Sequence, residues 1–70
     1  MERKAVSSSL LTSMGYDPET QTLEVEFSSN GGVWQYPCSP STYARLRQAD
    51  SIGRAFISEI RNKVVGERIS

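Results

Sequence analysis

The chain has 70 residues, enough for one domain, and its formal net charge is zero. Its single cysteine excludes an internal disulfide, and the lack of histidine argues against a zinc site, so we expect no cofactor or metal. A domain this small buries only about 60% of its unfolded surface, so either tight packing or self-association must stabilise it, and we expect a homo-oligomer.

Localisation follows from similar exclusions. No apolar run approaches the roughly 20 residues of a membrane span. The first ten residues lack the apolar core of a secretory signal. Because no disulfide is expected, a reducing compartment suits the chain. The sequence therefore predicts a cytoplasmic protein that does not associate with membranes.

The neutral charge hides a split between the two halves of the chain. Residues 1–40 carry a net charge of −3 and residues 41–70 a net charge of +3, and five of the six cations in the second half are arginines. The arginine side chain is a planar fork that binds phosphate or carboxylate through two hydrogen bonds. Two interpretations stay open: a solvated helical face with cations near helix C-termini, and an anion-binding face.

Strand patterns come first along the chain. Residues 1–6 are polar, and we expect a flexible lead-in there. Residues 10–16 alternate, which predicts a strand with Leu10, Thr12, Met14 and Tyr16 on one side. A turn over residues 17–21 follows. Residues 22–27 form the clearest strand pattern, and its apolar face consists of Leu23, Val25 and Phe27.

A hairpin is predicted next. Asn30-Gly31 lies between two strand patterns, and both residue types tolerate positive φ. The return strand covers residues 33–36, with Trp34 and Tyr36 on one face. Pro37 ends this strand because proline cannot continue a hydrogen-bonded ladder.

Helix signals fill the second half. Ser39 before Pro40 predicts an N-cap and a helix to about Gln48, and Ser51 predicts a second N-cap. The second helix has an apolar stripe of Ile52, Ala55, Phe56, Ile60 and Val64. The predicted fold class is α+β: an antiparallel hairpin or meander of about three strands, then two short helices packed on one face. We place the domain at residues 7–65 and a C-terminal tail at 66–70.

Five segments, taken together and in this order, resemble the KTSC domain family. They are Gly15-Tyr16-Asp17, Leu23-Glu24-Val25-Glu26-Phe27, Gly32-Val33-Trp34-Gln35-Tyr36, Ser51-Ile52-Gly53-Arg54-Ala55-Phe56 and Ile60-Arg61. The family is named for its place at the C-terminus of some lysyl-tRNA synthetases, and it also occurs as small free-standing proteins in bacteria and phages. The resemblance implies an α+β fold and, because RNA binding has been suggested for the family, a phosphate-bearing ligand.

Two positions depart from the family pattern. Trp34-Gln35-Tyr36 stands where the family usually has Tyr-x-Tyr, and Ser39-Pro40 stands in place of Val-Pro. These changes are compatible with the fold. They put a tyrosine-specific role at position 34 in doubt.

The start of the second helix is the first candidate site. A helix N-terminus presents unpaired N–H groups to a phosphate. Gly53 lets a ligand approach the backbone, Ser51 offers a hydroxyl, and Arg54 and Arg61 offer charged forks. The alternative is an ordinary N-cap with a small residue where helices meet.

The aromatic residues are the second candidate site. Trp34 and Tyr36 share a strand face where they could stack on bases or line the edge of a pocket. The alternative is that both pack in the core beneath the helices. Tyr16 has a similar status, because its hydroxyl either contacts a ligand or closes the first turn.

Catalysis finds little support. Cys38 has no histidine anywhere in the chain to act as its base, and Asp17 and Glu19 belong to a turn. We therefore predict no catalytic residues and a protein that is not an enzyme.

The sequence thus favours a non-catalytic binding module for a phosphate-bearing ligand. That ligand is either RNA or a small signalling nucleotide, which a phage-type sponge would sequester. The neutral charge disfavours a long nucleic acid. The alternative is a protein–protein interaction or homo-oligomerisation module, in which Glu24 and Glu26 face solvent or a neighbouring subunit and pair with its arginines.

Overall fold

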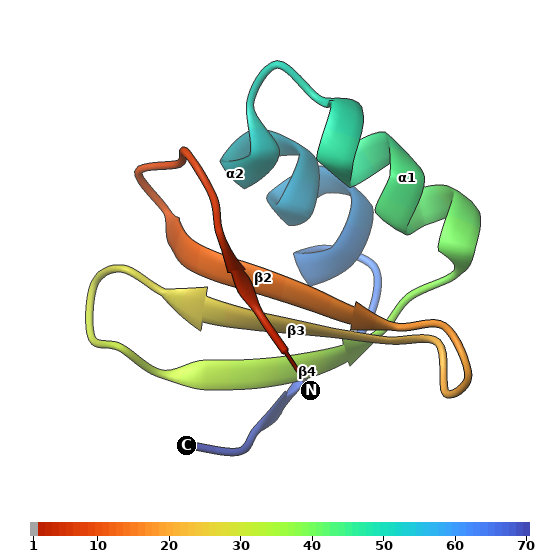
Figure 1. The fold of residues 1–70 in the computed structure, drawn as a ribbon, viewed down its shortest axis with the longest axis horizontal. Coiled ribbons are helices and arrows are strands. Elements are labelled where there is room, and N and C mark those ends of the chain that lie inside the picture. Colours follow the sequence, from red (N-terminus) through yellow and green to blue (C-terminus); the bar gives the residue numbers. More distant parts are fainter. Residues whose placement is uncertain (1) are drawn as a thin grey trace.

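The sheet is an antiparallel meander in which each strand pairs with the next along the chain. The computed structural model describes residues 2–70, and the strand order is β1-β2-β3-β4-β5. The strands are β1 (Lys4–Ala5), β2 (Leu11–Asp17), β3 (Thr22–Phe27), β4 (Val33–Pro37) and β5 (Glu67–Arg68). The helices are α1 (Pro40–Gln48), α2 (Ile52–Phe56) and a π-helical turn, η1 (Ile57–Arg61). The helices lie together on one side of the sheet (Figure 1).

The α+β class is confirmed, but the expected number of strands was too low. The sheet has five strands rather than about three, because β1 and β5 add a short strand at each edge. These strands are two residues long and lie in the segments taken for a lead-in and a tail. A two-residue strand is too short to show alternation, so only its pairing partner reveals it.

The predicted face of β2 was wrong at its first residues. Leu11 pairs with Phe27 but Ser13 pairs with Glu26, so Thr12 is an extra residue in a β-bulge. The bulge resets the alternation. As a result, Leu11 is fully buried and Thr12 is exposed, whereas Met14 lies in the core as expected.

Both predicted turns form as their residue types suggested. Gly31 has a φ of 69°, and its amide donates to the Phe27 carbonyl oxygen at 2.9 Å. The Asn30 side chain accepts a hydrogen bond from the Gly32 amide at 2.8 Å. The first turn is held by the Asp17 carboxylate, which accepts from the Glu19 amide at 2.9 Å. The turn chemistry therefore fixes the order of β2, β3 and β4.

The two predicted N-caps are confirmed. The Ser39 hydroxyl accepts from the Thr42 amide and the Ser51 hydroxyl from the Arg54 amide, each at 3.3 Å. The apolar stripe of the second helix faces the sheet, with Phe56 and Ile60 buried. The largest fully buried side chains are Phe56, Leu11, Leu23, Leu46, Ile60 and Val25. The core therefore lies between the helices and one face of the sheet.

The opposite face of the sheet holds a partly buried ion pair. Glu24 is 4% exposed, forms an ion pair with Arg3, and accepts a hydrogen bond from the Gln35 amide group at 2.9 Å. Burial raises the pKa of Glu24, but the Gln35 hydrogen bond and the Arg3 contact outweigh it and leave the pKa below its usual value. The expectation that Glu24 faces solvent or a neighbouring subunit was wrong, because residues of its own chain cover it.

Candidate ligand-binding pocket

A pocket of about 300 Å³ lies where the β3–β4 turn, β4 and the end of η1 meet. The side chains around it combine aromatic rings with polar groups. Its lining residues are Leu10, Phe27, Ser29, Asn30, Trp34, Tyr36 and Arg61. Three residues predicted for two separate candidate sites, Trp34, Tyr36 and Arg61, thus meet in one place.

Trp34 and Tyr36 take different roles although they share a strand face. Their rings stack with centroids 6.4 Å apart and planes at 20°. Tyr36 is only 6% exposed and meets the Phe56 ring edge-on at 5.2 Å, so it belongs to the core. Trp34 is half-buried and presents part of its indole to the pocket. Tyr36 therefore packs in the core, one of the two possibilities raised from the sequence, whereas Trp34 lies at the edge of the pocket.

Arg61 supplies the positive charge of the pocket. Its guanidinium carbon lies 6.0 Å from the centroid of the Phe27 ring. Burial raises the pKa of the Tyr36 hydroxyl, and the positive charge of Arg61 partly opposes this rise. Arg61 is the last residue of η1, whose wide turn rotates it relative to an α-helical course. The spacing that placed Arg61 on one face with Arg54 assumed a regular α-helix.

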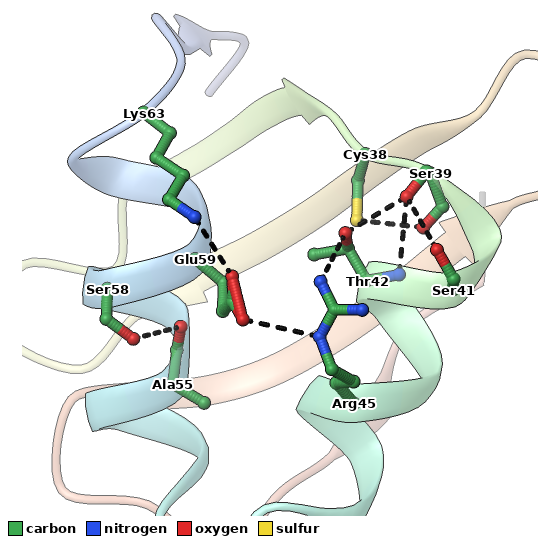
Figure 2. Close-up of polar contacts among 9 residues, drawn as sticks. All are labelled: Cys38, Ser39, Ser41, Thr42, Arg45, Ala55, Ser58, Glu59 and Lys63. Atoms are coloured by element: carbon green, nitrogen blue, oxygen red, sulfur yellow. Dashed lines mark hydrogen bonds and ion pairs between the residues drawn. The ribbon is translucent and has the colours of Figure 1, made fainter.

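Two other cations of the C-terminal half, Arg45 and Lys63, are already paired. Glu59 accepts from Arg45 at 3.3 Å and from Lys63 at 3.4 Å, which ties α1 to η1 (Figure 2). The Lys63 hydrogen bond and the charge of Arg45 lower the pKa of Glu59. Within residues 2–70, by contrast, Arg61 makes no ion pair. Its charge therefore remains available to an anion.

The C-terminal segment brings in residues that sequence reasoning did not single out as part of a site. Gly66 packs against Tyr36 so closely that a Cβ atom there would overlap the tyrosine ring. Beyond it, Arg68 pairs in register with Trp34. Residues directly opposite each other in an antiparallel pair point to the same face of the sheet. Arg68 therefore lies beside Trp34. The sequence did not predict this pairing, because β5 is only two residues long.

Three of the predicted phosphate-site residues lie outside this pocket. The Ser51 hydroxyl caps α2 through the Arg54 amide. Gly53 is buried, and the space beside its Cα is closed by Ser8 and Leu10 of the β1–β2 connection. Arg54 is exposed on α2. Gly53 therefore packs α2 against the β1–β2 connection, whereas the alternative from the sequence had expected a small residue where two helices meet.

Tyr16 also lies outside the pocket. Its hydroxyl donates to the Cys38 carbonyl oxygen at 2.7 Å, and its ring stacks on Tyr43 with centroids 4.4 Å apart. These contacts join β2 to the connection between β4 and α1. Tyr16 therefore holds two parts of the scaffold together.

The single cysteine shows no sign of activation as a nucleophile. Cys38 is buried, and burial raises the pKa of its thiol although Arg45 partly opposes the shift. A raised pKa keeps the sulfur in the unreactive thiol form. Within residues 2–70, no three histidine, cysteine or acidic side chains gather as a metal site would require. None of the helices in this range has the length and apolar character needed to cross a bilayer.

These features define a small α+β domain: a five-stranded meander with helices on one face and an aromatic pocket beside the last helical turn. The family model of the KTSC domain matches residues 7–63, most of the chain. The protein therefore belongs to the KTSC domain family, as the sequence resemblance predicted.

Two relatives agree with this assignment. An uncharacterized protein of Stutzerimonas stutzeri (strain A1501) is 53% identical over 57 residues, which cover 80% of this chain and 79% of the relative. The crystal structure of a KTSC domain protein from Yersinia pestis superposes with a TM-score of 0.91 at 34% identity. That match covers 99% of this chain and 97% of the other.

Proposed function

We propose that this protein is a non-catalytic module that binds a small phosphate-bearing ligand in the pocket between Trp34 and Arg61. One observation carries the proposal. An aromatic ring on β4 and an unpaired arginine at the end of η1 line the same pocket, although they are far apart in the sequence.

The pocket suits a nucleotide chemically. Base stacking on an exposed aromatic ring contributes about 1–3 kcal/mol per base. The Arg61 guanidinium can bind a phosphate through two parallel hydrogen bonds. Ser29 and Asn30 add polar groups at the β3–β4 turn. A ligand with a flat ring and a phosphate would use all of these groups.

The size of the pocket and the charge of the chain favour a small nucleotide over RNA. The pocket volume of about 300 Å³ lies at the lower end of the range for small-molecule sites. RNA-binding domains are usually basic, whereas this chain is neutral. We therefore infer a mononucleotide-sized ligand that is held without being transformed, as a sequestering protein would hold it.

The alternative, homo-oligomerisation, has less support from the fold. Both edge strands are two residues long and carry charged side chains, Lys4 in β1 and Glu67 with Arg68 in β5. Short, charged edges discourage pairing with another sheet. The Glu24 carboxylate is also engaged by Arg3 and Gln35. Light scattering checks this point, because a mass above that of one 7.8 kDa chain would favour self-association.

The proposal can be tested by thermal unfolding with a panel of linear nucleotides, cyclic nucleotides and RNA oligomers. A ligand that binds only the folded state at about 100 times its Kd stabilises it by about 2.7 kcal/mol. For a domain of this size, we expect a rise in Tm of about 10 °C or more. Failure of every nucleotide to raise the Tm would contradict the proposal. A rise in Tm with RNA oligomers alone would indicate that the ligand is RNA.

Two arginine variants locate the binding site. Arg61→Ala should abolish most of the ligand-induced rise in Tm, measured against the same variant without ligand. Arg54→Ala is the matched control, because Arg54 lies in α2, which continues directly into η1, but outside the pocket. Equal responses of the two variants would place the ligand elsewhere.

A further inference from the structure

Arg68 lies beside the proposed pocket although it comes from the far end of the chain. It is the register partner of Trp34, so the Cβ atoms of the two residues are about 5 Å apart on the same face of the sheet. Its neighbour Glu67 pairs with Gln35 and points to the opposite face. Of the two charged residues of β5, only Arg68 therefore lies on the same face of the sheet as Trp34.

Within residues 2–70, no acidic side chain forms an ion pair with Arg68. Its Nε donates to a main-chain oxygen of Ser70 at 3.0 Å, and its two terminal nitrogens have no hydrogen-bond partner among residues 2–70. No carboxylate lines the adjoining pocket. Trp34 is thus flanked by two arginines, Arg61 in the pocket wall and Arg68 on the neighbouring strand.

The path of the chain fixes this placement. Gly66 passes so close to Cδ2, Cε2 and Cζ of Tyr36 that a Cβ atom on Gly66 would overlap them. The chain then pairs with β4, and the Ile69 amide donates to the Val33 carbonyl oxygen at 2.9 Å. The C-terminal segment therefore has a defined position beside the pocket.

We propose that Arg68 is a second phosphate-binding residue of this site, and that its ligand class is the nucleoside monophosphates. This inference rests on the proposed function. Two arginines match the charge of one phosphate group, which is at most two negative charges. A triphosphate would bring more negative charge than two arginines neutralise.

The test is isothermal titration of the protein with the four ribonucleoside 5′-monophosphates, the matching nucleosides and one triphosphate. Arg68→Gln should weaken monophosphate binding by about tenfold, the usual scale for one charge-assisted hydrogen bond. It should leave nucleoside affinity unchanged, because the nucleoside lacks the phosphate. Glu67→Gln, next to Arg68 but on the other face, should leave both affinities unchanged.

The outcomes separate this inference from the proposed function. If monophosphates bind and Arg68→Gln leaves their affinity intact, the role of Arg68 is refuted while the function stands. Equal weakening of nucleoside and nucleotide would show a structural effect and also refute the role. Tighter binding of the triphosphate would refute the ligand class, and failure of every probe to bind would contradict the proposed function with it.

Discussion

Gly66 carries a steric requirement that its position near the chain end would not suggest. A methyl group there would overlap the Tyr36 ring, which is itself held against Phe56. Neither ring can move without disturbing the core. We therefore expect Gly66→Ala to lower the free energy of unfolding by about 1–3 kcal/mol.

Thermal denaturation measures this effect, since each kcal/mol lowers the Tm of a domain this small by about 4–8 °C. Val65→Ala is the matched control, because the Val65 side chain is 90% exposed and its loss should be nearly neutral. An unchanged Tm for Gly66→Ala would show that the C-terminal segment does not press on Tyr36.

Glu24 predicts a dependence of stability on pH. Its folded-state pKa lies below the ordinary value of 4.5, so the charged form is favoured by folding. The resulting stabilisation is present above pH 4.5 and is lost as the pH falls through the folded pKa. Urea unfolding at neutral pH and at about pH 3.5 should show this loss in the wild type.

Glu24→Gln removes the titrating group while keeping the shape of the side chain. We expect the variant to be less stable at neutral pH and to lose less stability on acidification. Arg3→Met should also destabilise the protein at neutral pH, because it leaves the buried carboxylate without its cation. An identical acid-induced loss in wild type and Glu24→Gln would contradict the assignment.

At the scale of elements, the start of α2 distinguishes a structural role from a binding role. The Ser51 hydroxyl caps the helix, and Gly53 is covered by Ser8 and Leu10. We expect Ser51→Ala to cost about 1 kcal/mol of stability, as Ser39→Ala should at α1. Nucleotide affinity should remain unchanged in both variants. Weaker binding by Ser51→Ala alone, measured well below its Tm, would return the phosphate site to this helix start.

The strands, turns and helix caps also show which local sequence patterns are sufficient to predict an element. Thr22–Phe27, Asn30-Gly31 and the Ser39 cap each contain residue types that favour one local conformation, and all were predicted. The bulge at Thr12 was missed because it arises from pairing with β3 rather than from the local sequence. β1 and β5 were missed because each is two residues long and is defined only by its hydrogen bonds to the neighbouring strand.

For the whole molecule, the candidate site could be predicted only in part. The residue types of Trp34 and Arg61 marked them in advance, since both suit nucleotides. Their convergence depends on how η1 packs over the sheet, and the approach of Arg68 depends on the register of β5. Such long-range relations are set by the assembled fold. Local patterns therefore named three wall residues of the pocket, Trp34, Tyr36 and Arg61, without showing that they meet.

The most direct test of the central claim uses the single tryptophan of the chain, Trp34, which lines the pocket. Fluorescence excited at the red edge, to avoid nucleotide absorption, should change saturably as a nucleoside 5′-monophosphate is added. Arg61→Ala should raise the apparent Kd by about ten- to a hundredfold, while Arg54→Ala should leave it unchanged. No saturable change in the wild type, or equal Kd values for the two variants, would contradict a nucleotide site between Trp34 and Arg61.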